Sequence, residues 1–268
     1  MKMPSLAKTI AHGLYWPRTA ALVCTVTALH CGQQEPAMAP AMEPTAPAQL
    51  SFSSEGLDAH VSPDARKAPA GSWVAQTSGT TTNLLGVWGA DTSHIWATGD
   101  AATILMWNGT TWTAQNNGAT GMIWSAWGTD ANDIWATGGF YANNTILQWN
   151  GTTWTLQPNS STNYFYGVWG LNISNIWTVG DGGIIMQWNG TTWAAQTSPT
   201  TNPLVGVWGT AANNVWAVGA SGTILKWNGT TWSAQKSGTT NTLVGVWGTD
   251  ANDIWVVGWD GTILRWVP

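Results

Sequence analysis

Hydrophobic residues recur along most of the chain in short runs, and each run ends at a glycine or a polar turn. From residue 71 onward four such runs follow one another in a fixed order. Their forms are Val-Trp-Gly, Ile-Trp-x-x-Gly, Thr-Ile-Leu-x-Trp and Thr-Thr-Trp-x-x-Gln. Apolar runs of this length between turn residues are typical of short β-strands. The pattern therefore predicts an all-β domain.

The turn between the third and fourth runs carries an Asn-Gly pair in four copies, as at Asn108-Gly109. Asn-Gly is a strong signal for a two-residue hairpin, because both residues tolerate positive φ. Such a turn would pair Trp107 with Thr110.

The four runs repeat five times, with a tryptophan at the same place in each. The period is 39 residues, except for one unit of 42 residues with a three-residue insertion. The repeated tryptophans are Trp73, Trp88, Trp96, Trp107, Trp112, Trp127, Trp135, Trp149, Trp154, Trp169, Trp177, Trp188, Trp193, Trp208, Trp216, Trp227, Trp232, Trp247, Trp255 and Trp266. A period near 40 with four strands per unit indicates propeller blades. We predict a five-bladed β-propeller of four-stranded antiparallel blades over residues 71–268.

The two ends of the repeat array are complementary. The first copy begins with a fourth run at Trp73, and the last copy ends after a third run at Trp266. An open array would expose strand edges, which proteins avoid. We expect the N-terminal strand to pair into the last blade and close the ring.

The first 31 residues have the pattern of an export signal. Basic residues precede an apolar stretch at 19–29, which is too short to span a membrane. The stretch ends at Cys31, and the segment resembles a bacterial lipoprotein signal, which implies a lipidated cysteine as mature N-terminus. His30 stands where that family has a small residue. A signal without lipid and a retained anchor are the alternatives.

Residues 32–70 are rich in proline, alanine and serine and lack an apolar period. Such a composition predicts a flexible tether, because it offers too little apolar surface to offset the entropy of ordering. We expect an extracytoplasmic protein with its lipid in a bacterial outer membrane, or otherwise a secreted protein.

Composition excludes several classes of function. Charged residues make up 8% of the chain, with eight Lys and Arg in total, so a nucleic-acid partner is not expected. Residues 71–268 hold one histidine, one arginine and no glutamate, which leaves no catalytic triad or zinc site. We predict no enzyme, no cofactor and no metal.

Aspartate is the acidic residue that the repeats do hold, mostly in turns such as 129–133 and 249–253. Turn residues that bond their own backbone are the main interpretation. A loop calcium site and a hydrolase with two aspartates are the alternatives.

The repeat resembles known propeller families. The stretch Gly180–Trp193, GDGGIIMQWNGTTW, is similar to the blade pattern of photosystem II assembly factors and of Asp-box sialidase repeats, although Trp107-Asn108 replaces the Asp-Gly of that motif. The whole unit looks closer to the VWG…NDVWAVG…WNG repeat proteins of myxobacteria, many of which are lipoproteins. The five-fold architecture is also similar to lectins of the tachylectin-2 type. These resemblances imply a propeller with a binding or assembly role.

Aromatic residues outside the repeat gather in two kinds of loop, which strand alternation places on one face of the ring. Phe165 aligns with leucines and is expected in the core, and Trp124 and Tyr166 are either enlarged core residues or ligand contacts. The candidate ligand-binding residues on this loop face are Trp124, Phe140, Tyr141, Tyr164, Tyr166, Trp259, Asp100, Asp181 and Asp260.

Amphipathic aromatics on a polar face are suited to binding carbohydrate or peptide. The sequence therefore predicts a non-catalytic, monomeric binding module that recognises a glycan or a surface protein of the envelope. A scaffold that assembles an envelope complex is the alternative.

Overall fold

The computed structural model describes residues 73–140 and 143–268. These belong to one compact unit, Pro69–Pro268. The expected signal, residues 1–31 with Cys31, and the expected tether, residues 32–70, lie outside the described residues, as does Tyr141.

The chain forms nineteen described strands and two short 3-10 turns. The first two sheets contain β1 (Leu84–Asp91), β2 (His94–Gly99), β3 (Ile104–Trp107), β4 (Trp112–Ala114), β5 (Ile123–Asp130), β6 (Asp133–Phe140), β7 (Asn143–Trp149) and β8 (Trp154–Leu156). The next two contain β9 (Phe165–Asn172), β10 (Asn175–Gly180), η1 (Asp181–Gly183), β11 (Ile185–Trp188), β12 (Trp193–Ala195), β13 (Leu204–Ala211), β14 (Asn214–Gly219), η2 (Ala220–Gly222), β15 (Ile224–Trp227) and β16 (Trp232–Gln235). The last contains β17 (Leu243–Asp250), β18 (Asp253–Gly258) and β19 (Ile263–Arg265).

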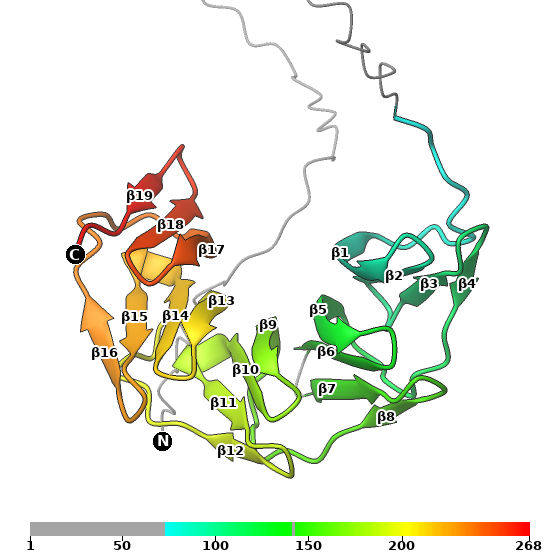
Figure 1. Cartoon of the computed structure of the whole chain (residues 1–268), viewed down its shortest axis with the longest axis horizontal. Helices are drawn as coiled ribbons and strands as arrows, with labels where there is room; N and C mark the ends of the chain where they lie inside the picture. Colours follow the sequence, from blue (N-terminus) through cyan, green and yellow to red (C-terminus); the bar gives the residue numbers. More distant parts are fainter. Residues whose placement is uncertain (1–72, 141–142) are drawn as a thin grey trace, which may run out of the picture. The chain divides into compact units, whose positions relative to one another are not determined.

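Each repeat folds into one antiparallel sheet with its strands in chain order. Four sheets have four strands, and the last sheet has three among the described residues. The first strands of successive sheets lie side by side, from β1 through β5, β9 and β13 to β17. Figure 1 shows the sheets following one another like blades around a common axis. The predicted all-β fold of repeated propeller blades is confirmed.

Hydrophobic cores lie between neighbouring sheets. In the core between the third and fourth sheets, Trp177 and Val179 of β10 pack with Leu204 of β13 and Trp232 of β16. Equivalent cores fill the other three junctions between successive sheets. Each sheet thus buries both of its faces only where it has a neighbour on both sides.

The repeated tryptophans are not buried equally. Those on the second strands are fully buried in the first four sheets, and Trp177 is 0% exposed. Trp169 on the first strand β9 is only half-buried. Its ring crosses to the next sheet, where a Cβ added to Gly209 would lie 2.9 Å from a ring carbon. The inner strands carry glycine there because the preceding indole occupies the space.

The turn between third and fourth strands differs from the two-residue prediction. Trp107 pairs with Trp112, which leaves four residues in the turn. The Asn108 side-chain oxygen accepts hydrogen bonds from the backbone N–H groups of Thr110 and Thr111, at 3.0 and 2.9 Å. This side-chain cap holds the longer loop closed, and it recurs at the other three Asn-Gly turns.

The predicted closure of the ring is not seen. Residues 73–83 form no strand, and the Trp73 side chain is fully exposed. The last sheet ends at β19 without a fourth strand (Figure 1).

Candidate functional site

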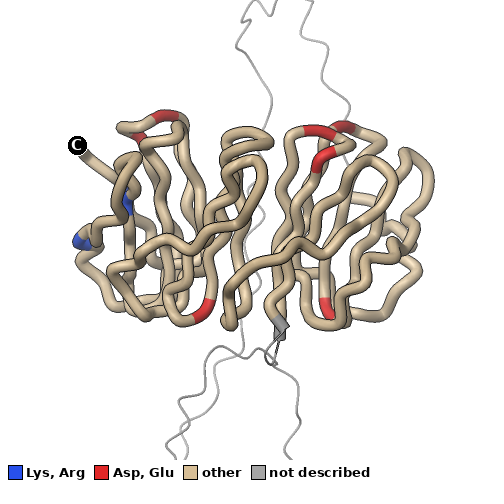
Figure 2. Tube along the Cα trace, turned by 90° about the horizontal axis from the view of Figure 1, so that it is seen from below, with Lys and Arg blue, Asp and Glu red and all other residues tan. Residues whose placement is uncertain are grey.

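Two kinds of loop meet on one face, as strand alternation predicts. In four of the five sheets the residue after the second strand donates a backbone hydrogen bond to the loop that enters the same sheet. The backbone N–H of Asp100 donates to the backbone oxygen of Asn83 at 3.0 Å. The same bond joins Asp181 to Tyr164 at 3.0 Å and Trp259 to Thr242 at 2.9 Å. We call the face that carries these two kinds of loop the loop face. In Figure 2 the acidic residues lie at the two opposite edges of the domain where strands turn.

Three aromatic side chains form a cluster on the loop face, at the junction of the second and third sheets. Trp124 of β5 meets Tyr166 of β9 edge to face, with ring centres 5.6 Å apart. Tyr166 in turn meets Tyr164, which directly precedes β9, at 5.5 Å and an interplanar angle of 87°. All three side chains are half-buried. We call Trp124, Tyr164 and Tyr166 the aromatic cluster.

Packing alone does not account for the aromatic cluster. Phe165 points into the core and is 0% exposed, as its alignment with leucine predicts. Its neighbours Tyr164 and Tyr166 remain partly accessible on the loop face. The counterpart of Tyr166 in the fourth sheet is the smaller Val205, which is also half-buried. A valine therefore suffices at this position, and bulky rings are not required to fill it.

The polar groups of the cluster lie in a partly dehydrated environment. Burial, followed by a hydrogen bond with Tyr164, raises the pKa of Tyr166 far above its ordinary value. The Trp124 indole N–H is buried and has no hydrogen-bond partner among the described residues. Asn163 donates to the Asp181 backbone oxygen at 3.0 Å, which holds the neighbouring loop against the cluster. The rings thus offer apolar area beside the neutral phenol of Tyr166 and the carboxylate of Asp181.

The other candidate residues do not join this cluster. Asp100 belongs to the first sheet and accepts a hydrogen bond from the Asn83 side-chain amide at 2.7 Å. Trp259 and Asp260 form the turn after β18 in the last sheet, where Asp260 has a φ of 52°. Phe140 was expected in a loop but ends strand β6 and pairs with Asn143, because the insertion lengthens that hairpin.

Aspartates on the opposite face serve the turns, which confirms their main interpretation. Asp91, Asp130 and Asp250 each accept a backbone N–H two residues on, at 2.7–2.8 Å. The Ser93 backbone N–H, with a hydrogen bond from His94, lowers the pKa of Asp91 to about 2. No three metal-ligating side chains gather among the described residues.

Sequence reasoning missed that Trp124 and Tyr166 touch across neighbouring sheets. Both stand at the second position of a first strand, 42 residues apart. Residues that hold the same place on the first strands of adjacent blades lie side by side. The equal place of Trp124 and Tyr166 in the repeat could therefore have predicted their contact.

Comparison with protein-family models and with curated proteins found no match. Among solved structures, the chain is similar to YCF48 from Cyanidioschyzon merolae, at 17% identity and a TM-score of 0.57 over 73% of this chain and 72% of that one. A streptogramin B lyase matches at 18% identity and a TM-score of 0.56, over 69% of each chain. The RRP9 WD40 repeats match at 11% identity and a TM-score of 0.60, over 70% of this chain and 61% of that chain.

These matches show the propeller fold. Because the fold is shared by a lyase and by WD40 repeats, function has to be argued from the surface. A helix long and apolar enough to cross a membrane is not found in the described part of the chain.

Proposed function

We propose that this protein is a non-catalytic binding module that recognises a glycan or a surface protein through its loop face. The observation that carries the proposal is the aromatic cluster, where three half-buried rings from neighbouring sheets meet edge to face. Rings in this arrangement present apolar surface with polar edges, which suits sugar rings and aromatic peptide side chains.

The polar surroundings of the cluster favour an uncharged ligand. Tyr166 is a neutral phenol at neutral pH, and burial raises its pKa further above the ordinary value. The buried Trp124 N–H has no hydrogen-bond partner among the described residues. A neutral ligand with hydroxyl or amide groups would satisfy these groups without the cost of burying a charge. A glycan is therefore the first ligand class to test.

The location is part of the proposal. The chain would be exported and held at the outer membrane by lipid on Cys31, with residues 32–70 as tether. Cys31→Ser is expected to abolish labelling by radioactive palmitate and to move the protein from the membrane to the soluble fraction. A membrane-bound Cys31→Ser protein would contradict the lipid anchor.

We further propose that the working form is a closed five-bladed ring. The last sheet carries three exposed side chains whose counterparts in the preceding sheet are buried. The exposed set is Trp255, Val257 and Ile263, and the buried set is Trp216, Val218 and Ile224. The first sheet exposes Leu84 and Val87, whereas the equivalent Leu204 and Val207 are buried. These two apolar faces would form a fifth core when they meet.

The binding proposal is tested with the full chain on a broad glycan array, beside a Tyr164→Ala/Tyr166→Ala variant that removes two of the three rings of the aromatic cluster. We expect binding that the variant loses. Binding that survives in the variant would move the site to the crevices between blades. Absence of glycan binding, together with capture of one stoichiometric envelope protein, would favour the scaffold over the glycan receptor.

A further inference from the structure

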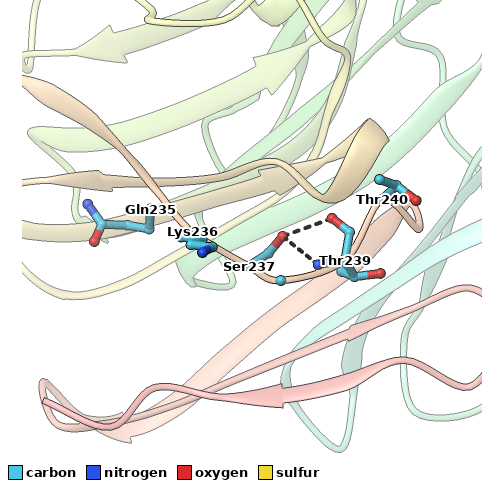
Figure 3. Close-up of a pocket in the computed structure, with 6 residues that line it drawn as sticks. Gln235, Lys236, Ser237, Thr239 and Thr240 are labelled. Atoms are coloured by element: carbon cyan, nitrogen blue, oxygen red, sulfur yellow. Dashed lines mark hydrogen bonds between the residues drawn. The ribbon is translucent and has the colours of Figure 1, made fainter.

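Two hydroxyl groups show the usual arrangement in this domain, a hydrogen bond to nearby backbone. In the loop after β16, the Ser237 hydroxyl donates to the Thr239 backbone oxygen at 3.1 Å and accepts from the Thr239 N–H at 3.3 Å (Figure 3). On β10, the buried Thr178 hydroxyl donates to the Gly167 oxygen at 2.9 Å. A buried hydroxyl without such a partner costs stability, because it loses its hydrogen bonds to water without a replacement.

Thr98 of β2 and Thr137 of β6 depart from this arrangement. Both side chains are 0% exposed, and neither hydroxyl has a hydrogen-bond partner among the described residues. The equivalent residues of the third and fourth sheets, Val179 and Val218, are also 0% exposed. Valine has the shape of threonine without its hydroxyl, so packing at this position does not require the polar group.

The Thr98 hydroxyl adjoins the residue that carries one ring of the aromatic cluster. Thr98 pairs with Gly86 across β1 and β2. A Cβ added to Gly86 would lie 2.7 Å from the Thr98 hydroxyl oxygen and 2.8 Å from the Trp124 backbone oxygen. Thr98 and Trp124 therefore meet at Gly86, on the junction of the first and second sheets.

Thr137 holds the same place at the next junction. Its side chain lies on the same face of β6 as Trp135, since residues two apart on a strand share a face. Trp135 packs in one core with Phe165, the residue before Tyr166. Thr137 also pairs with Ser125, which stands where the other four sheets have glycine. Polar departures from the repeat thus gather beside two rings of the aromatic cluster.

Within the repeat, threonine accompanies a ring and valine accompanies an aliphatic side chain. The comparison is with the second residue of the first strand in the following sheet. The pairs are Thr98 with Trp124, Thr137 with Tyr166, Val179 with Val205, and Val218 with Val244. A hydroxyl that packing does not need therefore occurs at the two junctions where an aromatic ring with a polar group lies on the loop face.

The indole N–H of Trp124 is a third unpaired group at this place. It is buried and has no partner among the described residues. An indole N–H only donates a hydrogen bond, whereas a threonine hydroxyl both donates and accepts. A ligand with several hydroxyl groups can satisfy both kinds of group, whereas an apolar side chain of a protein partner would leave all three unpaired.

We propose that Thr98 and Thr137 are specificity-determining residues of the ligand site at the aromatic cluster, and that their hydroxyl groups bind hydroxyl groups of a glycan. This inference rests on the binding function proposed above and selects the glycan from its two ligand classes. The half-buried rings of Trp124 and Tyr166 turn toward solvent to admit the ligand. Each threonine then gains a hydrogen bond at little further cost, because its hydroxyl is already removed from water.

The test replaces both threonines by the valine that the repeat carries elsewhere. The full chain with Thr98→Val/Thr137→Val is titrated with the free saccharide of the strongest hit from the glycan array. We expect Kd to rise at least about 10-fold, equal to about 1.4 kcal/mol, since two hydrogen bonds to the saccharide are lost. The melting midpoint is expected to rise by about 2 °C or more, because the variant no longer buries unpaired hydroxyls.

The matched control is Val179→Thr/Val218→Thr, which makes the reverse change at junctions without a ring. We expect an unchanged Kd and a lower melting midpoint for this control. Unchanged affinity of Thr98→Val/Thr137→Val would overturn the proposal and leave the binding function standing. A lower melting midpoint of that variant would also contradict it, because the hydroxyls would then have structural partners.

Deoxy analogues of the saccharide separate direct contact from an indirect effect. For an analogue that lacks a hydroxyl bound by threonine, we expect the difference in Kd between the unmodified chain and Thr98→Val/Thr137→Val to shrink. The same difference for every analogue would refute direct contact. Saccharide binding that the Tyr164→Ala/Tyr166→Ala variant retains, or no saccharide binding at all, would instead count against the proposed site or its glycan ligand.

Discussion

Replacing Trp177 with alanine is expected to lower the free energy of unfolding by about 3–5 kcal/mol, the usual cost of removing a buried large aromatic side chain. Trp177 is 0% exposed and contacts two indoles of the next sheet. The substitution therefore leaves a cavity between two blades that rigid strands cannot fill.

The measurement is chemical denaturation of the full chain followed by circular dichroism. Ile173→Ala is the matched control, because that side chain is exposed in the turn before β10. We expect a change of less than about 0.5 kcal/mol for the control. A Trp177→Ala protein as stable as this control would contradict the described packing between the third and fourth sheets.

Trp255→Ala is expected to be as destabilising as Trp177→Ala, at about 3–5 kcal/mol. The two residues hold the same place in their sheets, yet Trp255 is 40% exposed here because no blade covers it. Closure of the ring would bury Trp255 against Trp107 and Trp112 of the first sheet, as Trp177 is buried against Trp227 and Trp232.

Trp259 is the control for this prediction. It is 41% exposed, almost the same as Trp255, but lies on the loop face, where closure adds no contact equivalent to that of Trp177. We expect Trp259→Ala to change stability by less than about 0.5–1 kcal/mol. Equal, small effects of Trp255→Ala and Trp259→Ala would show that the last sheet stays uncovered in solution.

Most of the fold follows from the repeat. The fixed places of tryptophan and glycine predict the strands, because each repeated indole has to meet the glycine or the indole of the next blade. The four-residue turn at 108–111 was not predicted, since Asn-Gly alone does not reveal that the Asn108 side chain caps two further backbone N–H groups. Trp169 is half-buried because its strand lies beside the axis. The presence of a tryptophan in the sequence does not reveal this position.

The candidate site was only partly predictable. Topology places the loops on one face, and the structure confirms that loops such as those of Asp181 and Tyr164 adjoin. Which aromatics touch depends on the separation of neighbouring blades. Trp124 and Tyr166 therefore form a pair, whereas Trp259 stays with a different sheet.

Titration of a ligand into the full chain tests the central claim most directly, because it compares the aromatic cluster with an unrelated apolar patch. The ligand is the strongest hit from the glycan array, and the variants are Tyr164→Ala/Tyr166→Ala and Leu171→Ala/Ile173→Ala. Leu171 and Ile173 are exposed on the opposite face. We expect Kd to rise at least about 10-fold for the first variant, equal to about 1.4 kcal/mol, and to stay unchanged for the second. Equal affinity of both variants and the unmodified chain would contradict a binding site at the aromatic cluster.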